Sequence, residues 1–129
     1  MRSLPKELYW VGSSRKDLKA MPEPVRSDVG YALYEAQMGE KSDRAKTLKG
    51  FGSADVLEVI ASTRDGTYRA VYTVKFADAV YVLHCFEKKS KKGIATPKAD
   101  MDLIRSRLKE AEAHAKEGSE NGQDRKKRR

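Results

Sequence analysis

Residues 56–86 read VLEVIASTRDGTYRAVYTVKFADAVYVLHCF, and this stretch decides the fold of the chain. Three apolar runs rich in Val, Tyr, Ile and Phe are separated by an Asp65-Gly66 turn and by a second turn at Asp78. Asp-Gly favours a tight hairpin because both residues tolerate positive φ. The pattern predicts an antiparallel meander with strands over residues 56–61, 67–76 and 79–86.

The residues before the meander predict one strand and two helices. Residues 7–11 (ELYWV) are typical of a short strand. Apolar positions at helical spacing then predict helices over residues 14–21 and 24–38, which form a hairpin against the sheet. Residues 40–46 are charged and are expected to form a loop.

A last helix is predicted after the meander. Thr96 is a good N-cap and Pro97 suits the first helical position. Apolar residues from Met101 to Ala115 then recur at spacings of three, four, three and four, which is a core-facing stripe. The fold class is therefore α+β, with an antiparallel sheet of about four strands, an N-terminal helical hairpin and a C-terminal helix.

The 129 residues suit one domain over residues 1–116, followed by a basic tail, residues 117–129, that is expected to be disordered. The chain has a net charge of +8, of which the segment 118–129 supplies +3 from five bases and two acids, so the body carries +5. A basic body suits an anionic partner, although this charge is also ordinary for solubility.

Cys85 is the only cysteine, which excludes an intrachain disulfide and a cysteine-based zinc site. Its place in an apolar run indicates a buried, inert thiol. No metal or cofactor is expected. No apolar stretch approaches the roughly 20 residues that span a bilayer, so no membrane association is expected and the cytoplasm is the predicted location.

Charged residues within and around the meander are the candidate site. Glu58 interrupts an apolar strand and should meet a cation, which Arg69 on the next strand offers. Lysines gather where strands begin and end, and with Arg69 they predict an open cationic patch: Lys49, Lys88, Lys89, Lys91 and Lys92.

These motifs together resemble a known family. Leu48-Lys49-Gly50, Glu58, the run Tyr68 to Tyr72, the run Leu83 to Lys89 and then Thr96-Pro97 occur in the order seen in the RelE/ParE superfamily of bacterial toxins. The resemblance is nearest to the phage-derived HigB-type branch. It implies a RelE-like fold and a toxin neutralised by a cognate antitoxin protein, expected to be a helix-turn-helix protein. Operator DNA would then be bound only through the antitoxin.

The resemblance also implies an activity, which is cleavage of mRNA in the ribosome through attack of a 2′-hydroxyl on the adjacent phosphate. Arg69 would contact the scissile phosphate, Lys88 and Lys89 would stabilise charge, and Glu58 is a further catalytic candidate. Lys49, Lys91 and Lys92 would contact RNA. The general base stays open among Glu58, His84 and Tyr72, although His84 suits a satisfied core position and Tyr72 suits packing.

Two other functions remain open from the sequence. The ParE branch of the same superfamily implies a non-enzymatic inhibitor of DNA gyrase. A small basic RNA-binding or DNA-binding module without activity also fits the charge, and it would bind with a strong dependence on salt.

Overall fold

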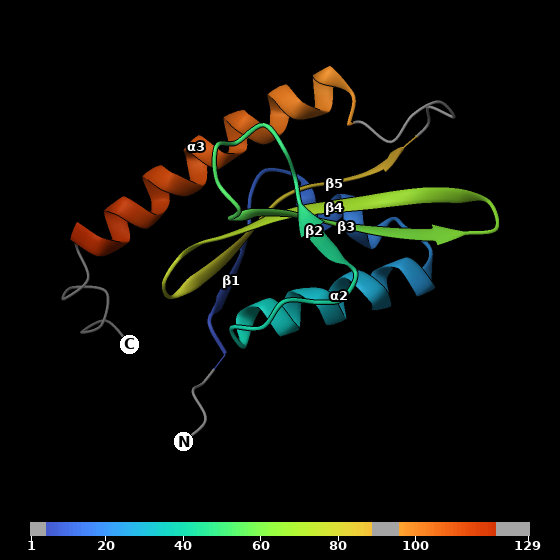
Figure 1. Ribbon diagram of the computed structural model, residues 1–129, viewed down its shortest axis with the longest axis horizontal. Helices are drawn as coiled ribbons and strands as arrows, with labels where there is room; N and C mark the ends of the chain where they lie inside the picture. Colours follow the sequence, from blue (N-terminus) through green and yellow to red (C-terminus); the bar gives the residue numbers. More distant parts are fainter. Residues whose placement is uncertain (1–4, 89–95, 121–129) are drawn as a thin grey trace.

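The computed structural model describes residues 5–88 and 96–120, with side chains as far as Gly118 (Figure 1). The chain alternates between a short strand, two helices, four strands and a long helix. The elements are β1 (Glu7–Trp10), α1 (Ser14–Lys19), α2 (Glu23–Gln37), β2 (Ala45–Thr47), β3 (Val56–Thr63), β4 (Gly66–Phe76), β5 (Ala79–Lys88) and α3 (Lys98–Glu120). The predicted α+β class and its helices are confirmed. The final helix continues to Glu120, whereas the sequence predicted its end near Lys116.

The sheet has five strands in the order β1-β5-β4-β3-β2 and is mixed, so the expected antiparallel sheet of about four strands is corrected. β1 pairs in parallel with β5, with Glu7 opposite Ala79. The helical hairpin between β1 and the meander lets the chain return to the same end of the sheet, so a parallel pair becomes possible. The three predicted meander strands pair antiparallel as expected.

β2 begins inside the segment 40–46, which was expected to be a charged loop, and ends one residue beyond it at Thr47. Ala45 pairs with Val59 and Thr47 pairs with Leu57 in an antiparallel ladder. Only Ala45 is buried in this three-residue strand. Three residues contain too little alternation for a period of two to be recognised in the sequence.

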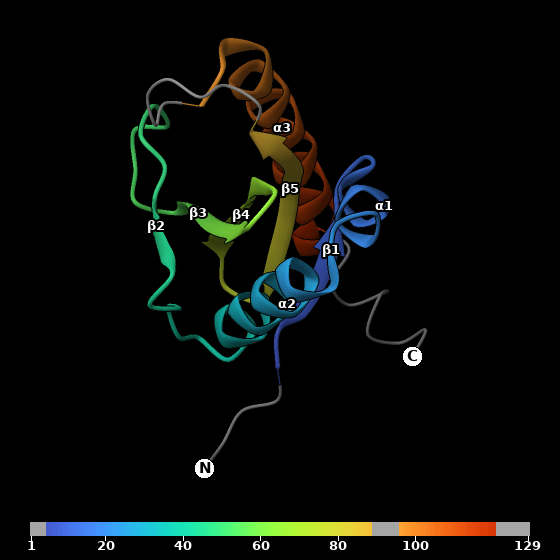
Figure 2. The ribbon, with the colours of Figure 1, turned by 90° about the vertical axis from the view of Figure 1, so that its right-hand side faces the viewer.

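Helices cover both faces of the sheet: α2 lies on one side and α3 on the other (Figures 1 and 2). The core under α1 and α2 contains the buried residues Val25, Val29 and Leu33 together with Val59 and Tyr72 from the sheet. The core under α3 contains Val56, Val71, Leu83, Ile104 and Ala111. Because side chains alternate along a strand, each strand residue faces one helical layer.

A β-bulge interrupts β5 beside α3. Val71 pairs with His84 and the next residue, Tyr72, pairs with Val82, so Leu83 is the extra residue of the bulge. A bulge re-aims side chains and leaves a backbone group outside the ladder. Here it presents His84 to α3 and leaves the Leu83 carbonyl available to a side chain of α3. Within the described ranges, no helix is long and apolar enough to cross a membrane.

Candidate active site

Glu58 and Arg69 form a buried ion pair on the face of the sheet that α3 covers. Arg69 Nη1 lies 2.7 Å from Glu58 Oε2, and the two side chains are 4% and 7% exposed. Glu58 is opposite Val71 and Arg69 is opposite Ile60, so the pair is diagonal across the β3–β4 ladder. Long side chains reach such diagonal neighbours. The predicted ion pair is therefore confirmed, with a diagonal register.

Thr96, just before α3, connects this pair to the helix. Its Oγ1 lies 3.4 Å from Arg69 Nη1 and donates to Glu58 Oε2 at 3.4 Å. Arg69 Nε is buried and has no hydrogen-bond partner in the described part of the chain. In the described part of the site, the guanidinium thus contacts the protein through Nη1 and leaves the Nε–H for an anionic oxygen.

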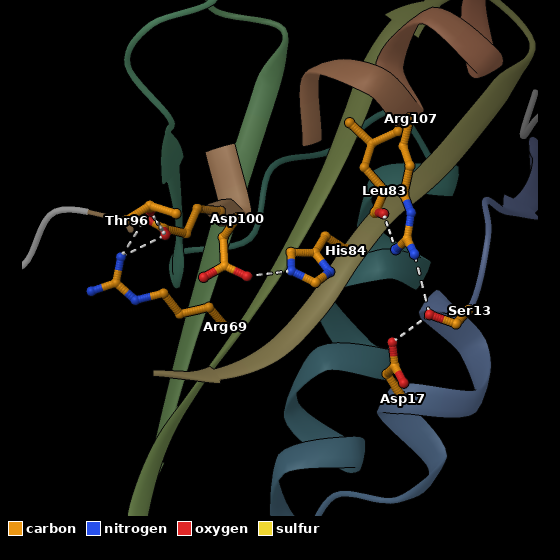
Figure 3. A network of polar contacts seen from close by, with 9 residues as sticks. Ser13, Asp17, Arg69, Leu83, His84, Thr96, Asp100 and Arg107 are labelled. Atoms are coloured by element: carbon orange, nitrogen blue, oxygen red, sulfur yellow. Dashed lines mark hydrogen bonds and ion pairs between the residues drawn. The ribbon is translucent and has the colours of Figure 1, made fainter. Parts of the chain in front are cut away.

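His84 and Asp100 form a second polar contact beside the first (Figure 3). His84 Nε2 lies 2.7 Å from Asp100 Oδ1, in the first turn of α3, and the side chains are 9% and 27% exposed. The His84 ring stacks on Phe86 with a centroid distance of 4.6 Å. His84 Nδ1 is buried without a partner among the described residues. The expected satisfied core histidine is therefore satisfied at one nitrogen only.

The predicted open cationic patch is corrected at Arg69, which is buried and neutralised by Glu58. Arg69 is shielded from solvent because it pairs with Glu58 on the neighbouring strand, and Thr96 at the start of α3 contacts both side chains. Lys88, the last residue of β5, is partly exposed and has an interaction partner of its own. The predictions for Lys89, Lys91 and Lys92 lie outside the described residues.

Lys49 is exposed on the β2–β3 connection, and this connection contacts α3. Arg105 Nη2 donates to the Gly50 carbonyl at 3.3 Å, and the Arg105 guanidinium lies 5.3 Å from the centroid of the Phe51 ring. Gly50 has a φ of 106°, which favours glycine. The structure therefore attaches this loop to α3 and leaves the Lys49 side chain in solvent.

Tyr72 is excluded from the site by its position on the opposite face of the sheet. It packs in the core under α1 and α2 and is fully buried. Burial raises the pKa of Tyr72 to about 12, and Glu35 adds to the shift. A phenol with that pKa beneath α2 is a packing residue, so the candidates for general base narrow to Glu58 and His84.

Arg107 was not recognised from the sequence, although it organises the same region. Its Nη1 donates to the Leu83 carbonyl at 3.0 Å and its Nη2 to Ser13 Oγ at 3.2 Å, and Ser13 donates to Asp17 at 2.7 Å (Figure 3). The available signal was its position three residues after Ile104, on the apolar stripe. Thr96 and Asp100 were not predicted as site residues, because Thr96 contacts Arg69 and Asp100 contacts His84 only in the folded protein.

In the ranges 5–88 and 96–120, no three His, Cys, Asp or Glu side chains are grouped as a metal site would require.

The family profile described as "Phage derived protein Gp49-like" matches residues 16–109, which is more than half of the chain. The chain belongs to the phage-derived Gp49-like family. The matched segment contains both polar contacts described above, the Glu58–Arg69 pair with Thr96 and the His84–Asp100 pair.

The fold of the chain is similar to that of a solved structure. A mutant of the Escherichia coli toxin RelE in the free state superposes with a TM-score of 0.54 at 17% identity, covering 83% of this chain and 98% of RelE. The RelBE2 toxin–antitoxin complex from Mycobacterium tuberculosis contains a chain with a TM-score of 0.46 at 19% identity, covering 66% of this chain and 100% of that one. No curated protein sequence matches. The predicted RelE-like fold is thus confirmed.

Proposed function

We propose that this Gp49-like protein is the toxin of a type II toxin–antitoxin system and that it cleaves mRNA on the ribosome. The RelE-like fold and the family support the toxin role. One observation carries the nuclease activity: a carboxylate and a guanidinium lie 2.7 Å apart, and Arg69 Nε–H has no hydrogen-bond partner among the described residues.

In the proposed reaction, the Arg69 guanidinium binds the scissile phosphate of mRNA. A forked guanidinium matches two phosphate oxygens, a geometry that lysine lacks. Glu58 accepts the proton of the 2′-hydroxyl as the bond from O2′ to phosphorus forms. The bond from phosphorus to O5′ breaks, and the leaving oxygen takes a proton from water; the hydroxide that remains takes the proton from Glu58, which restores water and the carboxylate. The products are a 2′,3′-cyclic phosphate and a 5′-hydroxyl end.

The remaining basic residues serve charge stabilisation and RNA contact in this proposal. Lys88, the last residue of β5, and Lys89, the next residue in the sequence, stabilise the phosphate that gains charge in the transition state. Lys49, Lys91 and Lys92 contact ribosomal RNA backbone. The partner in the resting cell is an antitoxin, expected to be a helix-turn-helix protein that also binds operator DNA, and the location is the cytoplasm.

The test is primer extension on cellular mRNA after induction, comparing wild type with Arg69→Lys. We choose Lys because Arg69→Ala would strand the buried Glu58 charge and unfold the protein for reasons unrelated to catalysis. Wild type should cut mRNA within translated codons, and Arg69→Lys should reduce cleavage about 100-fold, as the loss of one preorganised donor does. Arg44→Lys, an exposed arginine paired with Asp28, is the matched control and should cleave normally.

Three results would contradict the proposal. Full cleavage by Arg69→Lys would remove Arg69 from the site. Intact mRNA with DNA-damage signalling would indicate the gyrase inhibitor. Harmless overexpression without the antitoxin, together with salt-dependent RNA binding, would indicate the basic binding module.

A further inference from the structure

The bulge in β5 places His84 in a buried position, where an apolar side chain would cost less free energy of desolvation. His84 lies in the core under α3, opposite Val71 and stacked on Phe86. Burying a charged or polar pair is expensive, and apolar residues of the same size often stabilise such a position as well or better. The His84–Asp100 contact is therefore poorly explained by stability alone.

Asp100 lies in the first turn of α3, four residues after Thr96, which lies just before the helix, and this short separation connects the two polar contacts. The backbone N–H of Met101 donates to the Pro97 carbonyl at 2.9 Å, so regular helical bonding already includes Pro97. Pro97 is thus bonded into the first turn of α3, and Thr96 is joined to it by a planar peptide bond, so the point at which Asp100 is held restricts where Thr96 can lie. Thr96 in turn lies 3.4 Å from both Arg69 Nη1 and Glu58 Oε2.

Figure 3 shows this arrangement from close by: Asp100 lies between His84 on one side and Thr96 with Arg69 on the other. Arg107 independently holds the middle of α3 through the Leu83 carbonyl and Ser13. The loss of the His84–Asp100 contact would therefore release only the first turn of α3, while the rest of the helix stays docked. The contact therefore bears on the first turn of α3, beside which Thr96 meets Arg69.

The unbonded Arg69 Nε–H shows why that orientation matters. A buried donor without an acceptor costs about 1–3 kcal/mol, so a guanidinium free to rotate would turn this N–H toward water. Among the described residues, Glu58 and Thr96 hold the guanidinium through Nη1. A donor that stays without an acceptor in the free protein is preorganised to bind an anionic oxygen. Surrounding residues must hold the donor in this orientation.

We propose that His84 and Asp100 are positioning residues for Arg69: they fix the first turn of α3, so that Thr96 orients the guanidinium with its Nε–H directed to the substrate phosphate. His84 Nε2–H donates to the Asp100 carboxylate, which only accepts when ionised. The consequence for mRNA cleavage rests on the proposed function; the orientation of Arg69 does not.

The first experiment observes the guanidinium in the free protein. The Arg69 Nε–H signal in ¹H–¹⁵N NMR spectra is assigned by its loss in Arg69→Lys, and its exchange with water is measured. In Asp100→Ala the exchange should accelerate at least about tenfold, because the donor is no longer held in a buried position. Asp100→Asn keeps an acceptor oxygen for His84 and should retain most of the protection. Asp102→Asn, an exposed acid two residues later, is the matched control and should change nothing.

The Arg107 Nε–H signal separates positioning from general loss of structure. It should be unchanged in Asp100→Ala, since Arg107 has its own contacts. Unchanged Arg69 exchange in Asp100→Ala would overturn the proposal. Equal acceleration at Arg69 and Arg107 would also overturn it, because it would show that the pair merely docks the whole helix.

The second experiment measures cleavage on purified ribosomes. Asp100→Ala and His84→Leu should lower kcat about 10- to 100-fold with KM within about twofold, since small misplacement of a binding group costs this much. Asp100→Asn should restore most of the rate. A loss confined to KM, or no rescue by Asn, would contradict the positioning role. If wild type itself cleaves nothing, the proposed function fails, and the exchange data still decide whether the pair orients Arg69.

Discussion

Because Glu58 and Arg69 form a buried ion pair, we expect the effects of replacing each residue on the free energy of unfolding to be strongly coupled. Both side chains are more than nine-tenths buried, and their closest atoms are 2.7 Å apart. Replacement of one partner, by Arg69→Met or Glu58→Leu, leaves the other charge buried and should lower the free energy of unfolding by about 3–5 kcal/mol. The double variant replaces both charges by apolar groups and should lose no more than about 1–2 kcal/mol.

The assay is urea unfolding of the four proteins, followed by circular dichroism and by the fluorescence of Trp10, the only tryptophan. With a slope of about 2 kcal/mol per molar urea, a loss of about 4 kcal/mol moves the midpoint by about 2 M. If a single variant is unfolded in buffer, all four are compared in trimethylamine oxide, which strengthens folding without new contacts.

Two results would refute this reasoning. Single variants that each lose under about 1 kcal/mol would show that Glu58 and Arg69 are solvated. Additive losses in the double variant would show that the two groups do not interact. The matched control is the Lys75–Glu112 pair, whose side chains are 47% and 39% exposed, and its cycle should give a coupling below about 1 kcal/mol.

Three further predictions concern the surroundings of the site. Gly12→Ala should lower stability by about 2 kcal/mol or more in urea unfolding, because φ is 56° and the new Cβ would lie 2.7 Å from Arg107 Nε; an unchanged midpoint would contradict the close approach. Tyr72→Phe should be nearly neutral at pH 7, since the buried hydroxyl has no partner in the described chain. The wild-type protein should lose up to about 2–3 kcal/mol of stability between pH 10 and 12, because the folded pKa is raised to about 12 and the phenol ionises there only in the unfolded state. Tyr72→Phe has no phenol and should not show this loss; identical alkaline stability profiles of the two proteins would count against the prediction. Cys85 should resist iodoacetamide at pH 8 in the native protein and react in urea, since burial raises its pKa to about 12, and rapid native labelling would be inconsistent with this.

The meander was predictable because each of its signals is local. Alternation along a strand and the Asp65-Gly66 turn depend on residues close in sequence, and the hairpin formed as expected. The bulge at Leu83 was not predictable, because no glycine or proline marks it. It arises where the ladder between β4 and β5 accommodates His84 and α3 together.

The Glu58–Arg69 contact was predictable for a different reason. A carboxylate in an apolar strand requires a cation, and the register of one hairpin brings few basic residues within its reach. The partners of His84 could not be chosen in this way, because Asp100 is 16 residues away on a helix whose docking depends on the whole core. Arg107 on an apolar stripe was the visible hint of a buried polar anchor.

The sequence alone therefore determined the helices, the three meander strands and the pairing of one acid with one arginine, all of which follow from short-range periodicity and from the cost of an unpaired charge. Only the tertiary structure decided that β1 runs parallel to β5, that Arg69 is buried rather than open, and that α3 holds Thr96 and Asp100 over the sheet. The physical reason is that strand partners and burial are set by which surfaces meet, and surfaces distant in sequence meet through packing of the complete core.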